Sequence, residues 1–261
     1  MSEPIPYDAH RFRNAAAHYT AGRPPYSPAL IRRVAELTRL RPTYRLLDLG
    51  CGPGMLALAF APYVAEVIGM DPEPEMLRQA EEQAEGTGNV RFVRGSSYEL
   101  EPSLGAFRLV VMGRSFHWMD RPETLRRLDA MIEPDGLIAL FGDTHPDVPD
   151  NAWREPYRAV LDRYSGGGRD GHRTKGWVRH EAVLLDSAFS CLEAISVIER
   201  RRTDLDTLIR RALSQSSLAA AHRSGRTEDL ANELDQTLRP FMPDGLLTEV
   251  VSTYALLARR P

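Results

Sequence analysis

The segment Leu46–Gly54, with the sequence LLDLGCGPG, decides the fold of this chain of 261 residues. A short apolar run, interrupted only by Asp48, leads into glycines at positions 50, 52 and 54. This pattern is typical of a buried strand that enters a tight turn, because glycine lets the backbone bend sharply and approach a ligand closely. The apolar stretch from Met55 to Tyr63 predicts a helix directly after the turn, whose first N–H groups suit a polar ligand. A loop of this kind marks the nucleotide-binding edge of an open α/β sheet.

Strands and helices are predicted to alternate on both sides of this segment. Upstream, Ser27–Leu40 has apolar residues at helical spacing, with Ser27 placed to cap the helix and proline at its first position. Downstream, strands are predicted at 66–70, 90–94, 107–112 and 137–141, and helices at 73–85 and 124–132. Such alternation indicates βαβ units and a mostly parallel sheet with both faces covered.

The second half of the chain is less regular. Helices are predicted at 151–164, 178–186, 204–213 and 227–238, and strands at 191–198 and 248–258. Because strands return late, we expect one sheet that is completed by an antiparallel last strand rather than a second domain. The predicted organisation is a single domain over 1–261. It comprises N-terminal helices (1–40), a cofactor-binding core (41–142), a helical cover (143–190) and a segment that completes the sheet (191–261).

Composition excludes several classes of protein. The net charge of -3 provides no overall positive field for nucleic acid or an anionic membrane. Two cysteines are too few for a disulfide framework or a cysteine-rich zinc site, and no apolar run is long enough to span a bilayer. The polar start, Met1–Arg13, does not resemble a signal peptide. We therefore expect a cytoplasmic protein without a metal site, active as a monomer or homodimer.

An acidic residue follows the glycine loop at the position that a ribose would need. Asp71 ends the second predicted strand, 17 residues after Gly54, and a carboxylate there can accept hydrogen bonds from two ribose hydroxyls. Asp71 could equally cap the next helix. NAD-binding proteins share this arrangement, but their G-x-G-x-x-G pattern would need glycine where Met55 stands. The acidic Asp48 before the glycines also departs from the apolar strand of a dinucleotide site.

These segments resemble the conserved motifs of class I S-adenosylmethionine-dependent methyltransferases. Asp48–Gly54 resembles their motif I, and Gly69–Asp71 resembles their motif II. Arg94–Leu100 resembles the segment after the third strand that meets the adenine edge of the cofactor. Three further segments resemble the small-molecule subgroup (methyltransferase type 11, trans-aconitate methyltransferase-like): Phe12–Tyr19, Arg23–Tyr26 and Gly113–Asp120. Departures are Pro134–Gly136 in place of Pro-Gly-Gly, Tyr98 where an acidic residue is more usual, and two serines, Ser96 and Ser97, where Asp-Ala is common.

The resemblance implies a fold, a cofactor and a set of binding residues. The fold is an α/β, Rossmann-like, doubly wound, mostly parallel seven-stranded sheet with a small α-helical cover. The cofactor is S-adenosylmethionine, with S-adenosylhomocysteine as its product. The residues that the resemblance assigns to the cofactor are Tyr19, Arg23, Asp48, Gly50, Gly52, Gly54, Asp71, Pro72, Met76, Ser96, Ser97, Gly113 and Arg114.

Other residues are candidates for the methyl acceptor's side of the site. His117, just after the fourth strand, can act as a general base or be a structural residue. Trp118 can line the acceptor pocket or pack in the core, and His145 is a weaker candidate of the same kind. Trp153 and Tyr157 can form an apolar cover over the substrate or simply pack an auxiliary helix.

The expected reaction is transfer of a methyl group to an O, N or C nucleophile of a small molecule, in secondary metabolism. One alternative is a non-catalytic protein that keeps this fold and binds the cofactor or a partner. The other is a nucleic-acid methyltransferase, which would be expected to carry Asn/Asp-Pro-Pro-aromatic after the fourth strand, where this chain has Gly113–Phe116. We expect a small-molecule acceptor as partner, and neither nucleic acid nor membrane.

Overall fold

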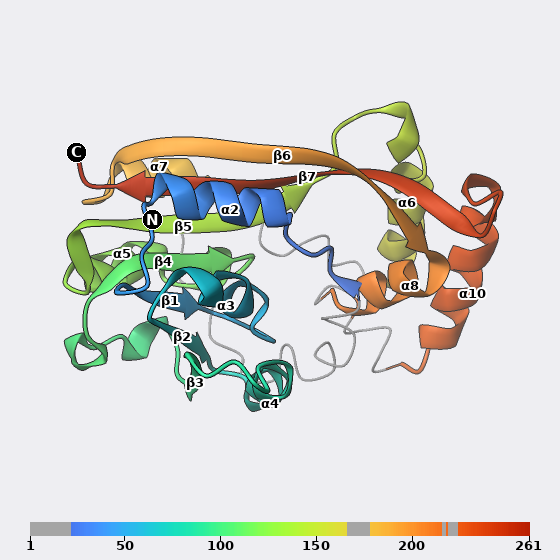
Figure 1. Ribbon diagram of the computed structural model, residues 1–261. Helices are drawn as coiled ribbons and strands as arrows, with labels where there is room; N and C mark the ends of the chain where they lie inside the picture. The colour runs from blue at the N-terminus through green and yellow to red at the C-terminus, as the bar shows by residue number, and fades with distance from the viewer. Residues whose placement is uncertain (1–21, 166–177, 216–217, 219–223) are drawn as a thin grey trace.

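The computed structural model describes residues 22–165, 178–215, 218 and 224–261 (Figure 1). In this part of the chain the strands form one seven-stranded sheet in the order β3-β2-β1-β4-β5-β7-β6. The strands are β1 (Arg45–Leu49), β2 (Glu66–Asp71), β3 (Val90–Arg94), β4 (Phe107–Gly113), β5 (Ile132–Thr144), β6 (Cys191–Asp204) and β7 (Leu246–Arg259). The α-helices are α2 (Pro28–Leu37), α3 (Met55–Phe60), α4 (Pro74–Gln83), α5 (Arg121–Asp129), α6 (Arg154–Tyr164), α7 (His180–Leu185), α8 (Leu205–Leu213) and α10 (Thr227–Leu238).

The sheet has the predicted mostly parallel, Rossmann-like arrangement. Neighbouring strands from β3 through β2, β1 and β4 to β5 are parallel. The last strand, β7, is antiparallel to both β5 and β6, between which it lies. The prediction of an α/β sheet completed by an antiparallel last strand is therefore confirmed. Because parallel strands share a direction, the residues after β1, β2, β4 and β5 come together at one edge of the sheet.

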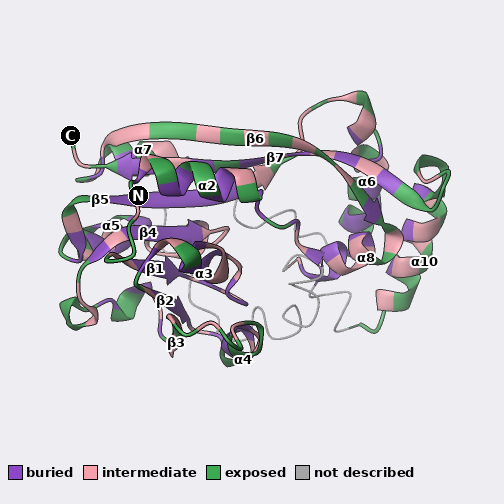
Figure 2. Cartoon of the chain, viewed as in Figure 1, coloured by how far each residue is buried: buried purple, intermediate pink, exposed green. Residues whose placement is uncertain are grey.

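Burial along the strands explains why they occupy these places. The central strands β1 and β4 are buried along almost their whole length, as expected where helices cover both faces. In contrast, β7 alternates between buried and less buried positions, and β6 shows a similar alternation (Figure 2). The outer hairpin thus has one covered face and one that is more open over part of its length.

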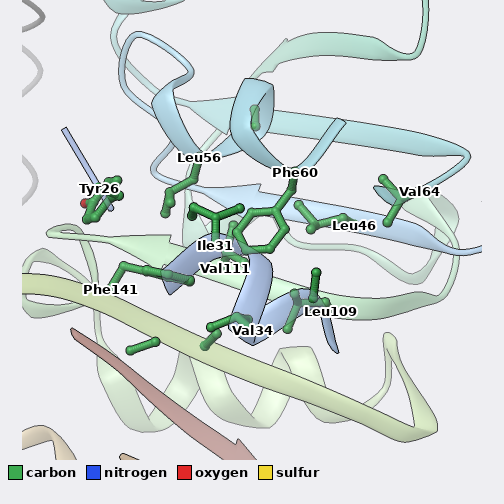
Figure 3. Close-up of a cluster of buried hydrophobic side chains, with 14 of the residues drawn as sticks. Tyr26, Ile31, Val34, Leu46, Leu56, Phe60, Val64, Leu109, Val111 and Phe141 are labelled. Carbon is green, nitrogen blue, oxygen red and sulfur yellow. The ribbon is translucent and has the colours of Figure 1, made fainter. Parts of the chain in front are cut away.

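Two apolar cores fix the helices to the sheet. On one face, α2 and α3 pack against β1, β4 and β5 through residues such as Phe60, Ile31 and Phe141 (Figure 3). On the other face, α5 and α7 pack through Leu128 and Leu184. Full burial of each such leucine or phenylalanine contributes about 1.5–3 kcal/mol relative to leaving it exposed.

Helix α2 begins at the predicted residue, but the predicted side-chain cap from Ser27 is not formed. Pro28 is the first residue of α2, and Ser27 occupies the N-cap position. The hydroxyl of Ser27 makes no capping bond and instead donates to Glu199 Oε1 at 2.9 Å. This bond ties the start of α2 to the edge strand β6.

Helices α6, α8 and α10 form a helical lobe beside the sheet (Figure 1). They share an apolar core that includes Trp153, Tyr157, Leu208 and Leu234. In the sequence, α8 and α10 follow β6 and precede β7. They therefore lie at the end of the β6–β7 pair where the chain passes from one strand to the other. The predicted boundary of the cover at residue 190 therefore does not coincide with the lobe, because α8 and α10 come from 191–261 in the described part of the chain. Within 143–190, α7 packs on the sheet instead, because Leu184 faces the second core.

Candidate functional site

The glycine loop is held in place by the neighbouring strand. The N–H groups of Gly50 and Cys51 both donate to the carbonyl of Met70, at 2.8 and 3.0 Å. The three loop glycines have φ of 70°, 52° and 82°, a left-handed region that glycine adopts at little cost. A Cβ on Gly54 would lie 2.9 Å from Phe92 Cζ, whereas one on Gly52 would meet nothing within 4 Å. Gly54 is thus required for packing, and Gly52 faces open space.

Asp48 supports the helix after the loop and keeps one oxygen available. Its Oδ2 accepts the N–H of Ala57, in the first turn of α3, at 2.9 Å. Its Oδ1 is buried and has no hydrogen-bond partner among the residues that the structure describes. Burial raises the pKa of Asp48 to about 7, the bond from Ala57 lowers it, and the charge of Asp71 raises it further. The predicted contact with the cofactor is compatible with this geometry, as is the observed support of α3.

Asp71 stands at the end of β2 and binds the loop from the other side. Its Oδ2 accepts the N–H of Gly52 at 2.8 Å, and its Oδ1 accepts the N–H of Glu73 at 2.9 Å. Burial raises the pKa of Asp71, and these two backbone bonds oppose that rise. Each carboxylate oxygen can accept a further hydrogen bond, so the side chain suits a ligand with two adjacent hydroxyls.

A small cleft opens between the loop and the end of β4. It is lined by Tyr26, Asp48, Gly50, Cys51, Gly52, Pro53, Met55, Leu56, Gly113 and Arg114. The structure thereby brings together residues that the sequence assigns to one site from β1, the loop and β4. Tyr26, Cys51, Pro53, Met55 and Leu56 were not predicted as site residues, although all but Met55 and Leu56 fall within the quoted motifs.

Arg114 is strained and fully engaged beside this cleft. It has φ of 56°, which costs about 1–3 kcal/mol for a residue other than glycine and is commonest at functional sites. Its guanidinium donates to Asp143 Oδ1 at 2.6 Å and to the carbonyl of Pro24 at 2.8 Å. It also lies 4.6 Å from the ring centroid of Tyr26. Although burial acts to raise the pKa of Asp143, the charge and hydrogen bond of Arg114 hold it below its ordinary value.

Of the other residues assigned to the cofactor, Pro72 follows β2, Ser96 and Ser97 follow β3, and Met76 lies in α4. Ser96 caps the short turn Ser97–Glu99 through its own hydroxyl and the Glu99 carboxylate. Ser97 and Met76 are buried, and Pro72 is half-buried. These residues do not line the cleft around Gly52, and their contact with a cofactor stays a prediction.

His117 lies in an aromatic cluster just after β4. Its ring centroid is 4.8 Å from that of Trp118 and 6.5 Å from that of His180, which begins α7. Burial, followed by the charge of Arg121, lowers the pKa of His180 to about 4. The Nη1 atom of Arg121 lies 3.3 Å from His180 Nδ1, and arginine can only donate. His180 is therefore neutral with its proton on Nε2. Sequence reasoning missed His180, because its place in the chain carries no recognisable motif.

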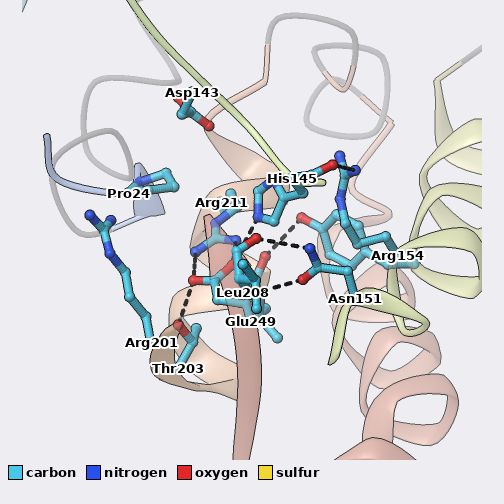
Figure 4. Close-up of polar contacts among 12 residues, drawn as sticks. Pro24, Asp143, His145, Asn151, Arg154, Arg201, Thr203, Leu208, Arg211 and Glu249 are labelled. Atoms are coloured by element: carbon cyan, nitrogen blue, oxygen red, sulfur yellow. Dashed lines mark hydrogen bonds and ion pairs between the residues drawn. The ribbon is translucent and has the colours of Figure 1, made fainter. Parts of the chain in front are cut away.

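His145 and the predicted cover residues belong to the junction between the sheet and the helical lobe (Figure 4). His145 Nε2 lies 3.0 Å from Glu249 Oε2, and its ring packs against Trp153. Trp153 and Tyr157 are 2% and 6% exposed and face the lobe's own core, so little of either ring is free for a substrate. Their contact with an acceptor stays a prediction.

The remaining predicted residues are Arg23 and Tyr19. Arg23 is half-buried, and its Nη2 donates to the carbonyl of Ser214 at 3.4 Å. Tyr19 lies outside the described residues. Among the residues that are described, no group of three or more His, Cys, Asp or Glu side chains could hold a metal ion. Within the same residues, every helix is too short or too polar to cross a membrane.

Comparisons with known proteins match this chain to methyltransferases. Residues 46–136 match the family model described as a methyltransferase domain. The methyltransferase YcgJ of Bacillus subtilis is 34% identical over 112 residues, which is 42% of this chain and 44% of that protein. For the first three curated relatives, the matched region spans 44–62% of the relative's own length.

Two solved structures share the fold over most of the chain. The crystal structure of YcgJ has a TM-score of 0.55 at 21% identity, and covers 90% of this chain and 100% of its own. An S-adenosylmethionine-dependent methyltransferase from Geobacter sulfurreducens, crystallised with S-adenosylhomocysteine, has a TM-score of 0.53 at 17% identity. The alignment covers 99% of both chains. At these identities the likeness establishes the fold.

Proposed function

We propose that this chain, whose residues 46–136 match the methyltransferase domain model and whose strands form a Rossmann-like sheet, is a class I S-adenosylmethionine-dependent methyltransferase. The observation that carries the proposal is the arrangement of Asp48 and Asp71 around Gly52. Two buried carboxylates retain acceptor positions on either side of a glycine that faces open space. A glycine loop that binds a dinucleotide would not need the carboxylate of Asp48.

The described residues fit S-adenosylmethionine in their chemistry. The open oxygen of Asp48 suits a positively charged donor such as the cofactor's ammonium group. The oxygens of Asp71 suit the two ribose hydroxyls, and the bare backbone at Gly52 leaves room for the ligand between them. The NAD-dependent alternative is less well supported, since an acidic residue with an open oxygen has no obvious partner in a pyrophosphate.

When bound, the cofactor supplies an electrophilic methyl group on a sulfonium. The chain's own contribution is to position the two reactants and to exclude water, effects that can supply much of the reduction in the barrier. We assign to His117 the removal of a proton from the acceptor, because it stands after β4, next to the strand end that lines the cleft. Trp118, whose ring centroid lies 4.8 Å from that of His117, would form part of the acceptor pocket.

We propose a small-molecule acceptor of secondary metabolism with an O, N or C nucleophile, in the cytoplasm. The net charge of -3 supports this acceptor over nucleic acid. A non-catalytic protein with the same fold is the main alternative, and it predicts cofactor binding without turnover on any acceptor.

Calorimetric titration of the purified protein with three ligands tests the proposal. S-adenosylmethionine and S-adenosylhomocysteine are expected to bind, and NAD is not. At ligand concentrations about 100-fold above Kd, the two adenosyl ligands should each stabilise the fold by about 2.7 kcal/mol, which is readily seen as a thermal shift. If neither adenosyl ligand binds, or NAD binds as well as they do, the proposed function is wrong.

Binding of S-adenosylmethionine is expected to strengthen as the pH rises from 6 to 7.5. The Asp48 carboxyl has a pKa near 7 in the free protein, and only its ionised form attracts an ammonium group. Affinity should therefore rise by about tenfold across this range and then level off. Titrations in buffers of different ionisation enthalpy should detect the proton that is released below pH 7.

The matched variant for this pH dependence is Asp48→Asn. It keeps an oxygen to accept the N–H of Ala57 but cannot ionise. The variant should bind more weakly than the parent at pH 7.5, and with little change between pH 6 and 7.5. A variant that kept the parent's pH dependence would show that another group titrates.

A further inference from the structure

Strand β6 forms a long outer edge of the sheet in the described part of the chain (Figure 1). It is the last strand in the sheet order, and its residues from Cys191 to Asp204 all lie opposite residues of β7. At the usual rise per residue, a strand of this length is about 45 Å long. A free edge offers a row of N–H and carbonyl groups to any extended chain, so proteins generally cover or protect it.

The hydrogen bonds of β7 show which backbone groups of β6 point outward. Val250 lies opposite Arg200, but its N–H donates to Asn151 Oδ1 at 2.9 Å and its carbonyl accepts Asn151 Nδ2 at 2.8 Å. Val250 and Arg200 are therefore a pair without mutual hydrogen bonds. Because such pairs alternate with bonded pairs along an antiparallel ladder, every second residue of β6 directs its backbone away from β7. These residues are Leu192, Ala194, Ser196, Ile198, Arg200 and Arg202.

The outward edge of β6 is unoccupied in the described part of the chain. No described residue hydrogen-bonds to its outward N–H and carbonyl groups, from backbone or side chain. The side chains of the same residues are exposed from Ala194 to Arg202 (Figure 2). Among them, Ile198 is 62% exposed, more than any other large apolar residue that the structure describes. On the opposite face of the strand, Ile195 and Val197 pack against the core formed by α2 and α3.

The charges along β6 are arranged so that the strand can complement itself. Near its start, Glu193 is exposed and forms no ion pair within 4 Å among the described residues. Near its other end, Arg201 donates to Glu199 Oε2 at 2.8 Å and to the carbonyl of Pro25 at 2.9 Å. A surface hollow lies beside it, lined by Pro25, Tyr26, Pro28, Glu199, Arg200 and Arg201. An antiparallel copy of the strand would bring the acidic end of each to the basic end of the other.

We propose that two copies of this chain pair antiparallel along β6, so that their two sheets become one. Val197 of one copy lies opposite Val197 of the other, across a two-fold axis. Ser196 of each copy exchanges backbone hydrogen bonds with Ile198 of the other, and the two exposed isoleucines become diagonal neighbours, within reach of each other. This inference does not depend on the proposed function.

Charge selects this register among its neighbours. It places Glu193 of each copy opposite Arg201 of the other, at the surface hollow, and no two like charges lie directly opposite. A slide of two residues in one direction would place Glu193 opposite Glu199, which is repulsive. A slide of two residues in the other direction would place it opposite the neutral Thr203. A slide of one residue would put the outward backbone groups of one copy against the inward groups of the other.

Sedimentation velocity of the purified full chain, over a series of micromolar concentrations, tests the pairing. The parent should sediment as a species of twice the chain's 29.3 kDa. Because the dimer contains the contact of Glu193 with Arg201 twice, Glu193→Arg should weaken association by about tenfold or more. The matched control is Glu228→Arg, the same charge change at an exposed position of α10, and it should associate like the parent.

A second variant tests the backbone hydrogen bonds. Ser196→Pro removes an outward N–H, which an edge strand tolerates in a monomer because that N–H faces solvent. The variant should remain folded by circular dichroism and sediment as a monomer. If it folds poorly, Glu193→Arg decides the question, because the Glu193 side chain makes no hydrogen bond or ion pair that the fold needs in the described part of the chain.

Cysteine cross-linking tests the register, in a Cys191→Ser background that leaves only the buried Cys51. Val197→Cys should form a disulfide between copies under mild oxidation, because opposite residues of a non-hydrogen-bonded pair have Cα atoms about 4.5 Å apart. Ser196→Cys is the matched control on the same strand. Its two copies are offset by two residues across the axis, beyond the limit of about 7 Å for a disulfide, and should not cross-link.

Three results would overturn the inference. A parent that stays monomeric at every concentration would leave the β6 edge to solvent or to a strand of another protein. A dimer that Glu193→Arg and Ser196→Pro both leave intact would use another face of the molecule. A disulfide formed by Ser196→Cys in place of Val197→Cys would contradict the register and the charge pairing that selects it.

Discussion

Gly52→Val is expected to abolish measurable binding of S-adenosylmethionine while the protein remains folded. The Cβ position of Gly52 faces open space between Asp48 and Asp71, where the proposed ligand would lie. A valine there would occupy the site itself and resist the left-handed backbone that the loop needs. A clash of this kind with a bound ligand should cost at least about 2.7 kcal/mol, which is a loss of 100-fold or more.

The control for backbone strain is Gly86→Val. Gly86 has φ of 82°, also meets nothing within 4 Å at its Cβ position, and lies in the turn after α4, away from the cleft. Both variants should be destabilised by a comparable amount, about 1–2 kcal/mol, because a left-handed conformation strains any L-residue. Only Gly52→Val should lose the ligand in calorimetry. Equal binding by the two variants would remove the loop from the cofactor site.

The loop and its strand could be predicted from sequence because their determinants are local. The apolar run, the glycines and Asp48 all lie within Leu46–Gly54, and the same short segment forms β1 and the turn. Asp71 follows the same logic, since the end of one parallel strand must lie beside the end of the next. Helical periodicity likewise placed α10 at Thr227–Leu238, with the bounds that the structure gives.

The long-range contacts could not be predicted in this way. The hydroxyl of Ser27 bonds to Glu199, 172 positions away, although its local sequence favours a helix cap. His145 meets Glu249 across 104 positions, and no spacing or motif connects the two. The helical lobe is a third example, because amphipathic patterns predict α6, α8 and α10 as helices without saying that they pack on one another. Which distant residues meet depends on how the strands and helices are arranged in space, and no local pattern in the sequence specifies that arrangement.

Glu249→Gln is expected to cause a large loss of stability. The Glu249 side chain is 2% exposed and accepts hydrogen bonds from Arg211, Thr203 and His145. Glutamine keeps the shape but removes the charge that compensates the buried guanidinium. Breaking such a pair costs about 3–5 kcal/mol, or on the order of 10 °C in Tm for a chain of this size. Thermal and urea unfolding of the parent and variant measure this loss.

The compensating variant separates the charge from the packing. Replacing both partners, as Arg211→Met with Glu249→Leu, should recover much of the stability, because no uncompensated charge remains buried. The surface control is Asp150→Asn. Asp150 Oδ2 lies 2.7 Å from Nε of Arg200, whose side chain is 71% exposed. Loss of this exposed ion pair should lower the stability by less than about 1 kcal/mol. A double variant no more stable than Glu249→Gln would mean that the hydrogen bonds to Thr203 and His145 matter more than the ion pair.

The stability difference between the parent and Glu249→Gln should depend on pH, which tests the role of the Glu249 charge independently. Burial acts to raise the pKa of Glu249, but the hydrogen bonds from His145 and Arg211 and the charge of Arg211 outweigh it and hold the pKa below the ordinary 4.5. A carboxyl with a lowered pKa contributes stability above its unfolded value and loses it as the pH falls. The difference in stability between the parent and Glu249→Gln should therefore be full at pH 7 and shrink as the pH falls below about 4.5. If the difference stayed constant down to the acid transition, the charge of Glu249 would not be what holds the lobe to the sheet.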